Sequence, residues 1–298
     1  MSHDHHHGHD HGTAGKRLGL AFGLNVAFTL IELVGAWFTN STAIAADALH
    51  DLGDSLSLAL AWGMQSLSGS RPTQTYSYGF KRLSLVGALV NAVVLLAGGL
   101  VVLMEAVPRL WDPGQPDARG MLALAVLGVV VNGAAVLRVR QGASLNERVV
   151  TWHLMEDVLG WVAVLIVSIV MLFVDLPVLD PLLSVGITVW VGFNAARNLK
   201  RTIDVFLQAV PDDVDVDALC EAARAVEGVV DLRHVHVWSQ EGEHHVLTGS
   251  LVLDCVTLED AERIREQVAD DLQEAGIEHV TLEVVSSTRA GALDAACG

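Results

Sequence analysis

Long apolar runs dominate the first two thirds of the chain and alternate with short polar connectors. Six of these runs approach the roughly 20 residues that an α-helix needs to cross a bilayer. Turn-forming residues separate them, as in the connector Asp112-Pro113-Gly114. The pattern predicts an α-helical membrane protein with six transmembrane helices, which cover residues 18–38, 43–67, 83–107, 121–137, 149–174 and 178–199.

A different pattern begins after Pro211. Residues 214–226 have helical spacing, whereas residues 230–239 and 246–253 alternate between apolar and polar positions, as strands do. A charged amphipathic helix then runs from Thr257 or Glu259 to about Ala275, and residues 279–285 form a last strand. Gly276 is a typical stop signal for that helix. The order αββαβ predicts a small C-terminal α+β domain, which pairing with a second copy would stabilise.

Composition agrees with a membrane domain followed by an acidic one. The chain has 298 residues, 52% of them hydrophobic, and its mean hydropathy of +0.45 is high for a soluble protein. From residue 204 onward, 21 acidic and 5 basic residues carry −16 of the net charge of −17, which argues against nucleic-acid binding. We expect a His-rich tail at 1–15, a transmembrane domain at 16–203, a cytoplasmic domain at 204–290 and a disordered tail at 291–298.

The basic residues of the membrane half predict its orientation. Eleven lie on the side of the two termini, and only Arg109 and Arg119 lie on the other side. Because Lys-rich and Arg-rich loops stay in the cytoplasm, both termini are expected there, in a multi-pass protein of a bacterial cell membrane. Cys220, Cys255 and Cys297 show no CxxC spacing and no disulfide framework, which fits a reducing compartment. The eleven basic residues are Lys16, Arg17, Arg71, Lys81, Arg82, Arg138, Arg140, Arg148, Arg197, Lys200 and Arg201.

Two His-x-x-x-Asp pairs lie inside the apolar runs. They are His50 with Asp54 and His153 with Asp157. Residues four apart share one face of a helix, about one turn from each other. An ionisable side chain at membrane depth is costly and marks a functional site. Two imidazoles and two carboxylates form a complete tetrahedral ligand set for Zn²⁺, so the sequence predicts an intramembrane metal site.

Other acidic residues lie close to these pairs. Asp47 precedes His50 by three residues, and it either orients the imidazole, relays protons or lies at a helix N-terminus where the dipole favours it. Glu32 lies inside the first run and has either a structural hydrogen bond or a place in an aqueous cavity. Asp51 and Glu156 adjoin ligand positions but project in other directions. The roles of all four stay open at this point.

Histidine is concentrated in two further places. Residues 1–12 hold six of the thirteen histidines, and this irregular His-Asp-Gly composition predicts loose metal capture. In the C-terminal domain, His234 and His236 lie on one face of a predicted strand, with Glu283 among their possible partners. They form either a regulatory metal site or an ordinary solvated surface.

Several stretches in order carry a family resemblance. They are residues 41–54 (STAIAADALHDLGD), 76–82 (YSYGFKR), 153–157 (HLMED), 180–184 (DPLLS) and 236–239 (HVWS). Together with the six apolar runs they make residues 17–285 resemble the cation diffusion facilitator family of zinc transporters. The resemblance implies a homodimeric antiporter that exports cytosolic Zn²⁺ in exchange for protons by alternating access. It also implies a transport site on the second and fifth helices and a ferredoxin-like cytoplasmic domain that dimerises and senses zinc.

The resemblance assigns the transport site to His50, Asp54, His153 and Asp157. The manganese members of the family tend to lack these histidines, which favours zinc. The chain departs from the family in three places. Leu83-Ser84 follows Arg82 where the family often has Ala-Glu, and the His-rich segment is N-terminal rather than in a loop. Arg233-His234 replaces a His-Asp pair, so the ligands of the family's cytoplasmic domain are not carried over.

Exchange of metal for protons also has a physical basis. Metal ligands must be deprotonated and imidazole titrates near neutral pH, so protons and Zn²⁺ compete for one site. An intramembrane metalloenzyme with Glu156 as its base is disfavoured, because the sequence has no HExxH motif and four ligands leave no open position. A metal sensor that moves nothing is the other alternative. The ligand types do not separate Zn²⁺ from Cd²⁺, Co²⁺ or Ni²⁺.

Overall fold

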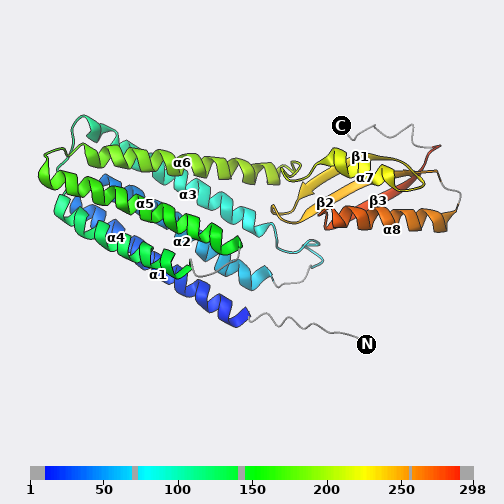
Figure 1. Cartoon of the computed structure of the whole chain (residues 1–298), viewed down its shortest axis with the longest axis horizontal. Coiled ribbons are helices and arrows are strands. Elements are labelled where there is room, and N and C mark those ends of the chain that lie inside the picture. The colour runs from blue at the N-terminus through cyan, green and yellow to red at the C-terminus, as the bar shows by residue number, and fades with distance from the viewer. Residues whose placement is uncertain (1–10, 69–72, 140–144, 255–256, 289–298) are drawn as a thin grey trace. The chain divides into compact units, whose positions relative to one another are not determined.

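The computed structural model of the chain describes residues 11–68, 73–139, 145–254 and 257–288. They belong to two compact units, one of Met1–Ser70 with Gly87–Leu199 and the other of Arg71–Val86 with Lys200–Gly298. The first unit is helical and the second contains the sheet (Figure 1). The elements before residue 210 are α1 (His11–Thr39), α2 (Thr42–Ser68), α3 (Leu83–Ala106), the short 3-10 helix η1 (Pro108–Leu110), α4 (Ala118–Val139), α5 (Leu145–Phe173) and α6 (Leu179–Phe206).

The six long helices match the six predicted ones in number and order. Among the described residues, α1, α3, α4, α5 and α6 contain five segments that are long and apolar enough to span a membrane. Helix α2 has a similar length, 27 residues, but its described part contains three carboxylates, on Asp47, Asp51 and Asp54. The helix with the weakest membrane signal is therefore the one that carries the first His-Asp pair.

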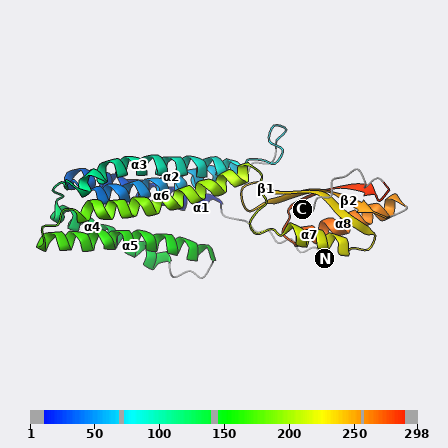
Figure 2. The ribbon, with the colours of Figure 1, turned by 90° about the horizontal axis from the view of Figure 1, so that it is seen from above.

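Close helix contacts hold the bundle together. Helix α1 packs against α2, and α4 packs against α5, which lie together on one side of the bundle in Figure 2. Gly128 of α4 makes room for the buried ring of Trp161 on α5, since a Cβ at Gly128 would lie 2.1 Å from Trp161 Cδ2. Gly53 of α2 likewise faces Leu95 of α3. Small residues at such positions let two helices approach closely.

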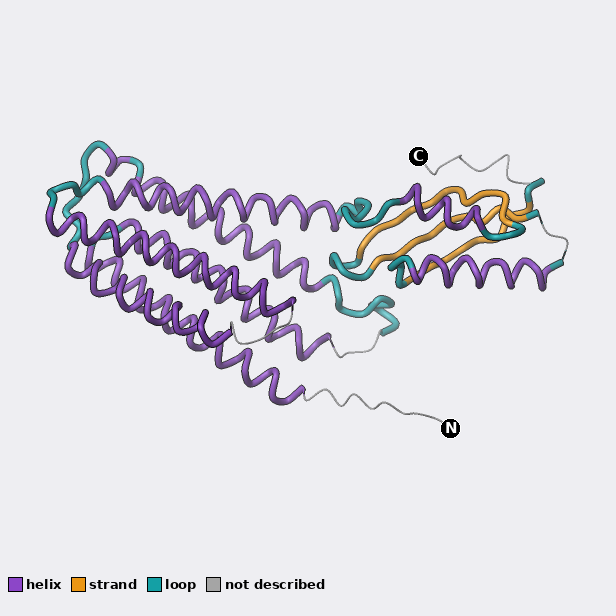
Figure 3. The backbone as a smooth tube through the Cα atoms, in the orientation of Figure 1, coloured by secondary structure: helices purple, strands orange, loops and turns teal. Residues whose placement is uncertain are grey.

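The second unit contains the predicted α+β domain (Figure 3). Its order is α7 (Val216–Ala225), β1 (Val229–Ser239), β2 (His245–Leu253), α8 (Leu258–Glu274) and β3 (His279–Ser286). Strand β2 lies in the centre, antiparallel to β1 and parallel to β3. Helices α7 and α8 bury their apolar faces in one core with the strands, around Leu247 and Leu251. The predicted αββαβ order is confirmed, and Thr257 is the N-cap of α8.

One prediction about cysteine chemistry is wrong. Cys220 on α7 is fully buried and disulfide-bonded, whereas its sequence context predicted a free thiol. The other two cysteines, at 255 and 297, lie outside the described residues. Sequence spacing gave no signal here because disulfide partners are brought together by the fold, not by their separation along the chain.

Asp231 of β1 forms two ion pairs in this domain, one with Arg224 of α7 and one with Arg233 of β1. Arg224 Nε and Arg233 Nε each donate to one carboxylate oxygen of Asp231, both at 2.8 Å. Partial burial opposes ionisation of Asp231, but the hydrogen bonds from Arg233 and Arg224 outweigh it and hold its pKa below the ordinary 3.8. The ion pairs therefore stabilise the domain above that ordinary pKa and lose their effect as the pH falls through the lowered value.

We expect Asp231→Asn to lower the free energy of unfolding of this domain by up to about 1 kcal/mol at neutral pH, because both ion pairs are partly exposed. The difference from the wild type should disappear as the pH falls through the lowered pKa of Asp231. Hydrogen exchange of the β1 amides, corrected for intrinsic rates, measures it. Asp254→Asn, at an exposed position after β2, is the control. A difference that persists at strongly acidic pH would contradict this account.

Candidate metal centre

Helices α2 and α5 bring three of the four predicted ligands together. His50 and Asp54 lie one turn apart on α2, and Asp157 lies on α5. His50 Nε2 is 3.5 Å from Asp157 Oδ1 and 3.9 Å from Asp54 Oδ2. One nitrogen or oxygen atom from each residue lies within 4.8 Å of the other two, and no other group of three His, Cys, Asp or Glu among the described residues does so.

The spacing of these atoms fits a tetrahedral cation. Zn²⁺ binds imidazole nitrogen and carboxylate oxygen at about 2.0–2.2 Å, which separates two ligand atoms by roughly 3.4 Å at the tetrahedral angle. The distance of 3.5 Å from His50 to Asp157 already matches, and that to Asp54 needs a small contraction. Asp157 is 9% exposed, and the side chains of His50 and Asp54 are each 23% exposed. The ligands are therefore largely shielded from solvent but still accessible to an ion.

The fourth predicted ligand, His153, falls in α5 one turn before Asp157. Its side chain lies outside the described residues, which for side chains exclude 145–154. The helix is continuous from Leu145 to Phe173, so the one-turn spacing between His153 and Asp157 is present in the backbone. The sequence prediction for His153 rests on that spacing. The first ten residues of the His-rich segment also lie outside the description.

Asp47 lies beside the three ligands but is not one of their group. It is buried, at 4% exposure, and a Cβ at Gly160 of α5 would lie 3.2 Å from Asp47 Oδ1. Gly160 follows Asp157 by about one turn, so Asp47 faces α5 one turn away from the ligand cluster. Its Oδ2 has no hydrogen-bond partner among the described residues. Asp47 therefore lies next to the cluster but outside the group of three.

A polar seam between α1 and α2 supports the site and was missed from the sequence. Asn25 Nδ2 donates to the carbonyl of Asp51 at 3.1 Å and to Ser55 Oγ at 3.0 Å. Glu32, on the same helix, is fully buried and faces Asp51. The sequence feature that could have indicated this seam is the recurrence of Asn25, Thr29 and Glu32 at helical spacing within an apolar run. These contacts hold α1 against the residues next to both α2 ligands.

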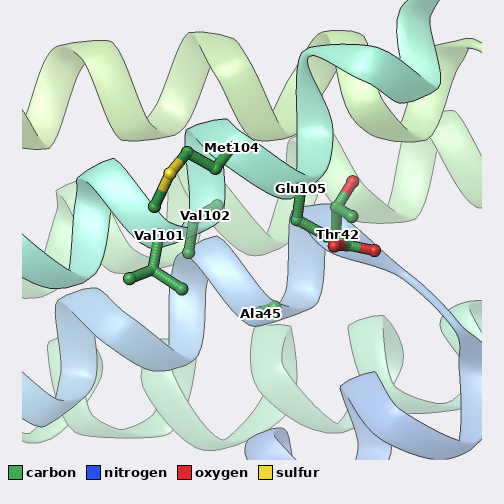
Figure 4. Close-up of a pocket in the computed structure, with 6 residues that line it drawn as sticks. All are labelled: Thr42, Ala45, Val101, Val102, Met104 and Glu105. Carbon is green, nitrogen blue, oxygen red and sulfur yellow. The ribbon is translucent and has the colours of Figure 1, made fainter.

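A cavity of about 370 Å³ lies between α2 and α3, away from the ligands. Figure 4 shows Thr42 and Ala45 of α2 facing Val101, Val102, Met104 and Glu105 of α3. Its lining is mostly apolar, and none of His50, Asp54 and Asp157 contributes to it. The cavity is therefore no part of the metal site.

The C-terminal domain contains a second arrangement of possible ligands. His234 and His236 of β1 are exposed, and their Nε2 atoms lie 3.3 Å apart. A break in the β1–β2 register between Arg233 and His236, with a positive φ of 50° at His234, brings the two rings onto one side of the strand. Glu283, the predicted third partner, lies on β3 and accepts from Ser250 of β2. The central strand β2 thus separates Glu283 from the pair.

Comparison with known proteins agrees with this arrangement. Residues 18–207 match the cation efflux transmembrane domain, and residues 211–284 match the cytoplasmic domain of cation efflux proteins. The zinc transporter ZitB of Escherichia coli is 30% identical over 95% of this chain and 92% of its own length. The cation efflux system protein CzcD of Cupriavidus metallidurans is 30% identical over 93% of this chain and 89% of its own length.

A third relative, the cadmium, cobalt and zinc/H(+)-K(+) antiporter of Bacillus subtilis, is 28% identical over 93% of this chain and 91% of its own length. The fold, the two matched domains and these relatives define a multi-pass membrane transporter and not an enzyme. The chain belongs to the cation diffusion facilitator family, whose members carry divalent metal cations out of the cytosol.

We expect Asp157→Ala to weaken metal binding at the α2–α5 cluster by roughly 100-fold or more. Four-ligand zinc sites have binding free energies of about 10–16 kcal/mol, so one ligand accounts for several kcal/mol. Co²⁺ absorption of the purified chain, titrated with and without competing Zn²⁺, measures the affinity. Glu156→Ala is the matched control, since Glu156 is exposed and adjoins Asp157. Equal affinities in the Asp157→Ala variant and the wild type would rule out this ligand.

Proposed function

We propose that the chain exports cytosolic Zn²⁺ in exchange for protons through a site of His50, Asp54, His153 and Asp157. The observation that carries the proposal is the cluster of His50, Asp54 and Asp157 between α2 and α5 of the helical bundle. The ligand mix of imidazole and carboxylate suits zinc and its transition-metal neighbours, whereas Mg²⁺ and Ca²⁺ prefer oxygen ligands alone. Cd²⁺ and Co²⁺ are further substrates to expect, and both appear in the name of the Bacillus relative.

Proton exchange follows from the chemistry of the ligands. Binding of a cation requires deprotonated imidazole and carboxylate, so loading releases protons and protonation expels the metal. If the site opens alternately to the two sides, this competition becomes coupled exchange. The name of the Bacillus relative, a cadmium, cobalt and zinc/H(+)-K(+) antiporter, supports metal–proton exchange.

The direction of transport rests on the distribution of basic residues. The excess of Lys and Arg at the α2–α3 and α4–α5 connectors and near both termini supports a cytoplasmic position for these parts. Arg109, which donates to the carbonyl of Asn40 in the α1–α2 turn, and Arg119 would then lie on the extracytoplasmic side. The acidic C-terminal domain would be cytoplasmic, and its match to the family's cytoplasmic domain supports a homodimer in the cell membrane.

In proteoliposomes with an acidic interior, we expect the wild type to take up Zn²⁺ at a rate that depends on the pH gradient. Asp54→Ala should reduce this uptake by roughly 100-fold, because it removes a ligand of the transported ion. A zinc-sensitive dye inside the vesicles reports the rate. Glu156→Ala is expected to transport like the wild type. Coupled flux that survives Asp54→Ala would refute the site, and tight binding without any flux would favour a sensor.

A second candidate function is regulatory metal binding by the C-terminal domain. Two nitrogens bound to one tetrahedral Zn²⁺ lie about 3.3–3.4 Å apart. The Nε2 atoms of His234 and His236 are 3.3 Å apart, so the pair is arranged as half of a metal site. Both rings are exposed, which leaves room for water or a second copy to supply the remaining ligands.

With the transport site disabled by Asp157→Ala, we expect a further His236→Ala change to remove one bound Zn²⁺ per chain or per dimer. Equilibrium dialysis of the full chain counts the bound ions. His279→Ala in the same background is the matched control, since His279 is another exposed histidine of this domain. Every variant keeps the N-terminal histidines, so the Zn²⁺ that they bind adds equally to each count and does not affect the difference between variants. An unchanged count after His236→Ala would leave the pair as ordinary surface histidines.

A further inference from the structure

Helix α2 begins at a tightly bonded turn that is remote from the metal ligands. Asn40 has a positive φ of 51° and reverses the chain between α1 and α2. Ser41 Oγ accepts a hydrogen bond from the Ile44 amide at 3.2 Å, as an N-cap residue does. The Asp117 amide donates to the carbonyl of Thr39 at 2.8 Å, and Arg109 donates to the carbonyl of Asn40 at 3.1 Å. Residues from η1 and from the start of α4 therefore fix the turn.

The strongest hold on this turn comes from Asp180 in the first turn of α6. Its Oδ2 accepts from the amide of Thr42 at 2.8 Å and from Thr42 Oγ1 at 2.9 Å. Its Oδ1 accepts from the hydroxyl of Ser41 and from the amide of Ala43 at 3.2 Å. Four residues later on α6, Ser184 Oγ donates to the carbonyl of Thr42 at 2.9 Å. Asp180 is 1% exposed, so all of these bonds are shielded from solvent.

A carboxylate is the group that this place requires. The first amides of α2 have no partner within the helix, and the helix dipole favours an anion there. Four donors converge on the two oxygens of Asp180. An amide at this position would turn its NH₂ toward two of those donors. In apolar surroundings, groups left without a partner cannot be compensated by water.

The hydrogen bonds matter more because side-chain packing is incomplete on the other side of the turn. Thr42 and Ala45 face the cavity of about 370 Å³ between α2 and α3 (Figure 4). The cavity therefore leaves part of this end of α2 without packing against α3. His50 follows Thr42 by eight residues, or about 12 Å along a helix, so the hold on Thr42 determines the height and rotation of His50.

We propose that Asp180 is a positioning residue for metal transport, which holds α2 so that His50 and Asp54 lie opposite Asp157. The inference rests on the proposed function of the α2–α5 cluster. Asp180 acts on the metal through α2 and does not touch it. Its contacts fix one end of α2, so the conformational changes that open the site pivot about that end.

The test compares Asp180→Asn with Asp175→Asn in proteoliposomes of the full chain. Asp175 is exposed, lies five residues earlier and undergoes the same change of charge. We expect Asp180→Asn to raise the apparent KM for Zn²⁺ by about 10-fold and to change the preference for Zn²⁺ over Cd²⁺, because loss of a supporting partner typically weakens a metal site by 10–100-fold. Asp180→Glu keeps the charge and should restore part of both properties. A role in folding alone would lower the amount of active protein and leave KM and ion preference unchanged.

Three results would overturn the inference. Wild-type KM and ion preference in folded Asp180→Asn would refute it while leaving the proposed function intact. Absence of transport by the wild type and Asp175→Asn would refute the proposed function and the inference with it. If Asp180→Asn does not fold, Thr42→Val and Ser184→Ala each remove one hydroxyl of the same network. Both should raise KM a few-fold, and wild-type values in both would refute the inference.

Discussion

Several buried polar groups on α2 have partners from other helices, which matter because apolar surroundings offer no water to replace them. The partners differ along the helix. Asp180 of α6 takes the donors at the N-terminal end, Asn25 of α1 binds the carbonyl of Asp51, and Asp157 of α5 faces His50. Helix α2 carries three carboxylates in a bundle of apolar helices, and the contacts from α6, α1 and α5 help to hold it there. The same requirement determines the position of the metal ligands.

This division of contacts assigns different tasks to the parts of α2. At the N-terminal end of α2, Asp180 accepts from the amides of Thr42 and Ala43, and Ser184 donates to the carbonyl of Thr42. The middle is different, because His50 and Asp54 keep 23% of their side chains exposed and Asp47 has an oxygen without a partner among the described residues. Unsatisfied polar groups in a protein interior are costly and are kept where function requires them. Under the proposed function, the middle of α2 is the part that interacts with ions, and its hydrogen-bonded end is the part that stays fixed.

The sequence predicted the elements well because their patterns are local. Helical apolar runs, the αββαβ order and the N-cap of α8 at Thr257 all depend on neighbouring residues, and the structure confirms them. The spacing of His50 and Asp54 on one face is equally local. The meeting of these two with Asp157 is a long-range contact. The sequence predicted it from ligand chemistry, since two imidazoles and two carboxylates make one tetrahedral set, and the resemblance to the family assigned that set to the second and fifth helices.

What the sequence did not predict depends on the tertiary fold. Asp180 belongs to a stretch that carries the family resemblance, but its contact with the first turn of α2 appears only in the fold. The bulge at His234 places two ring nitrogens 3.3 Å apart, and no alternation pattern reports a bulge. Glu283 has a carboxylate that could bind a metal, but it lies on the far side of β2 from the histidines. The disulfide of Cys220 belongs to the same class, since it joins residues that the chain order does not relate.

Charge balance gives a physical reason to expect exchange at the α2–α5 cluster. A divalent cation on two carboxylates and two neutral imidazoles is electrically neutral, which is the state that a low-dielectric interior favours. When the ion leaves, Asp54 and Asp157 would retain two negative charges close to the carboxylates of Asp47 and Asp51. Like charges that lie close together in such surroundings repel strongly. Protons are the positive charges that can reach the ligands themselves, so the empty carrier returns across the membrane most easily when it carries them.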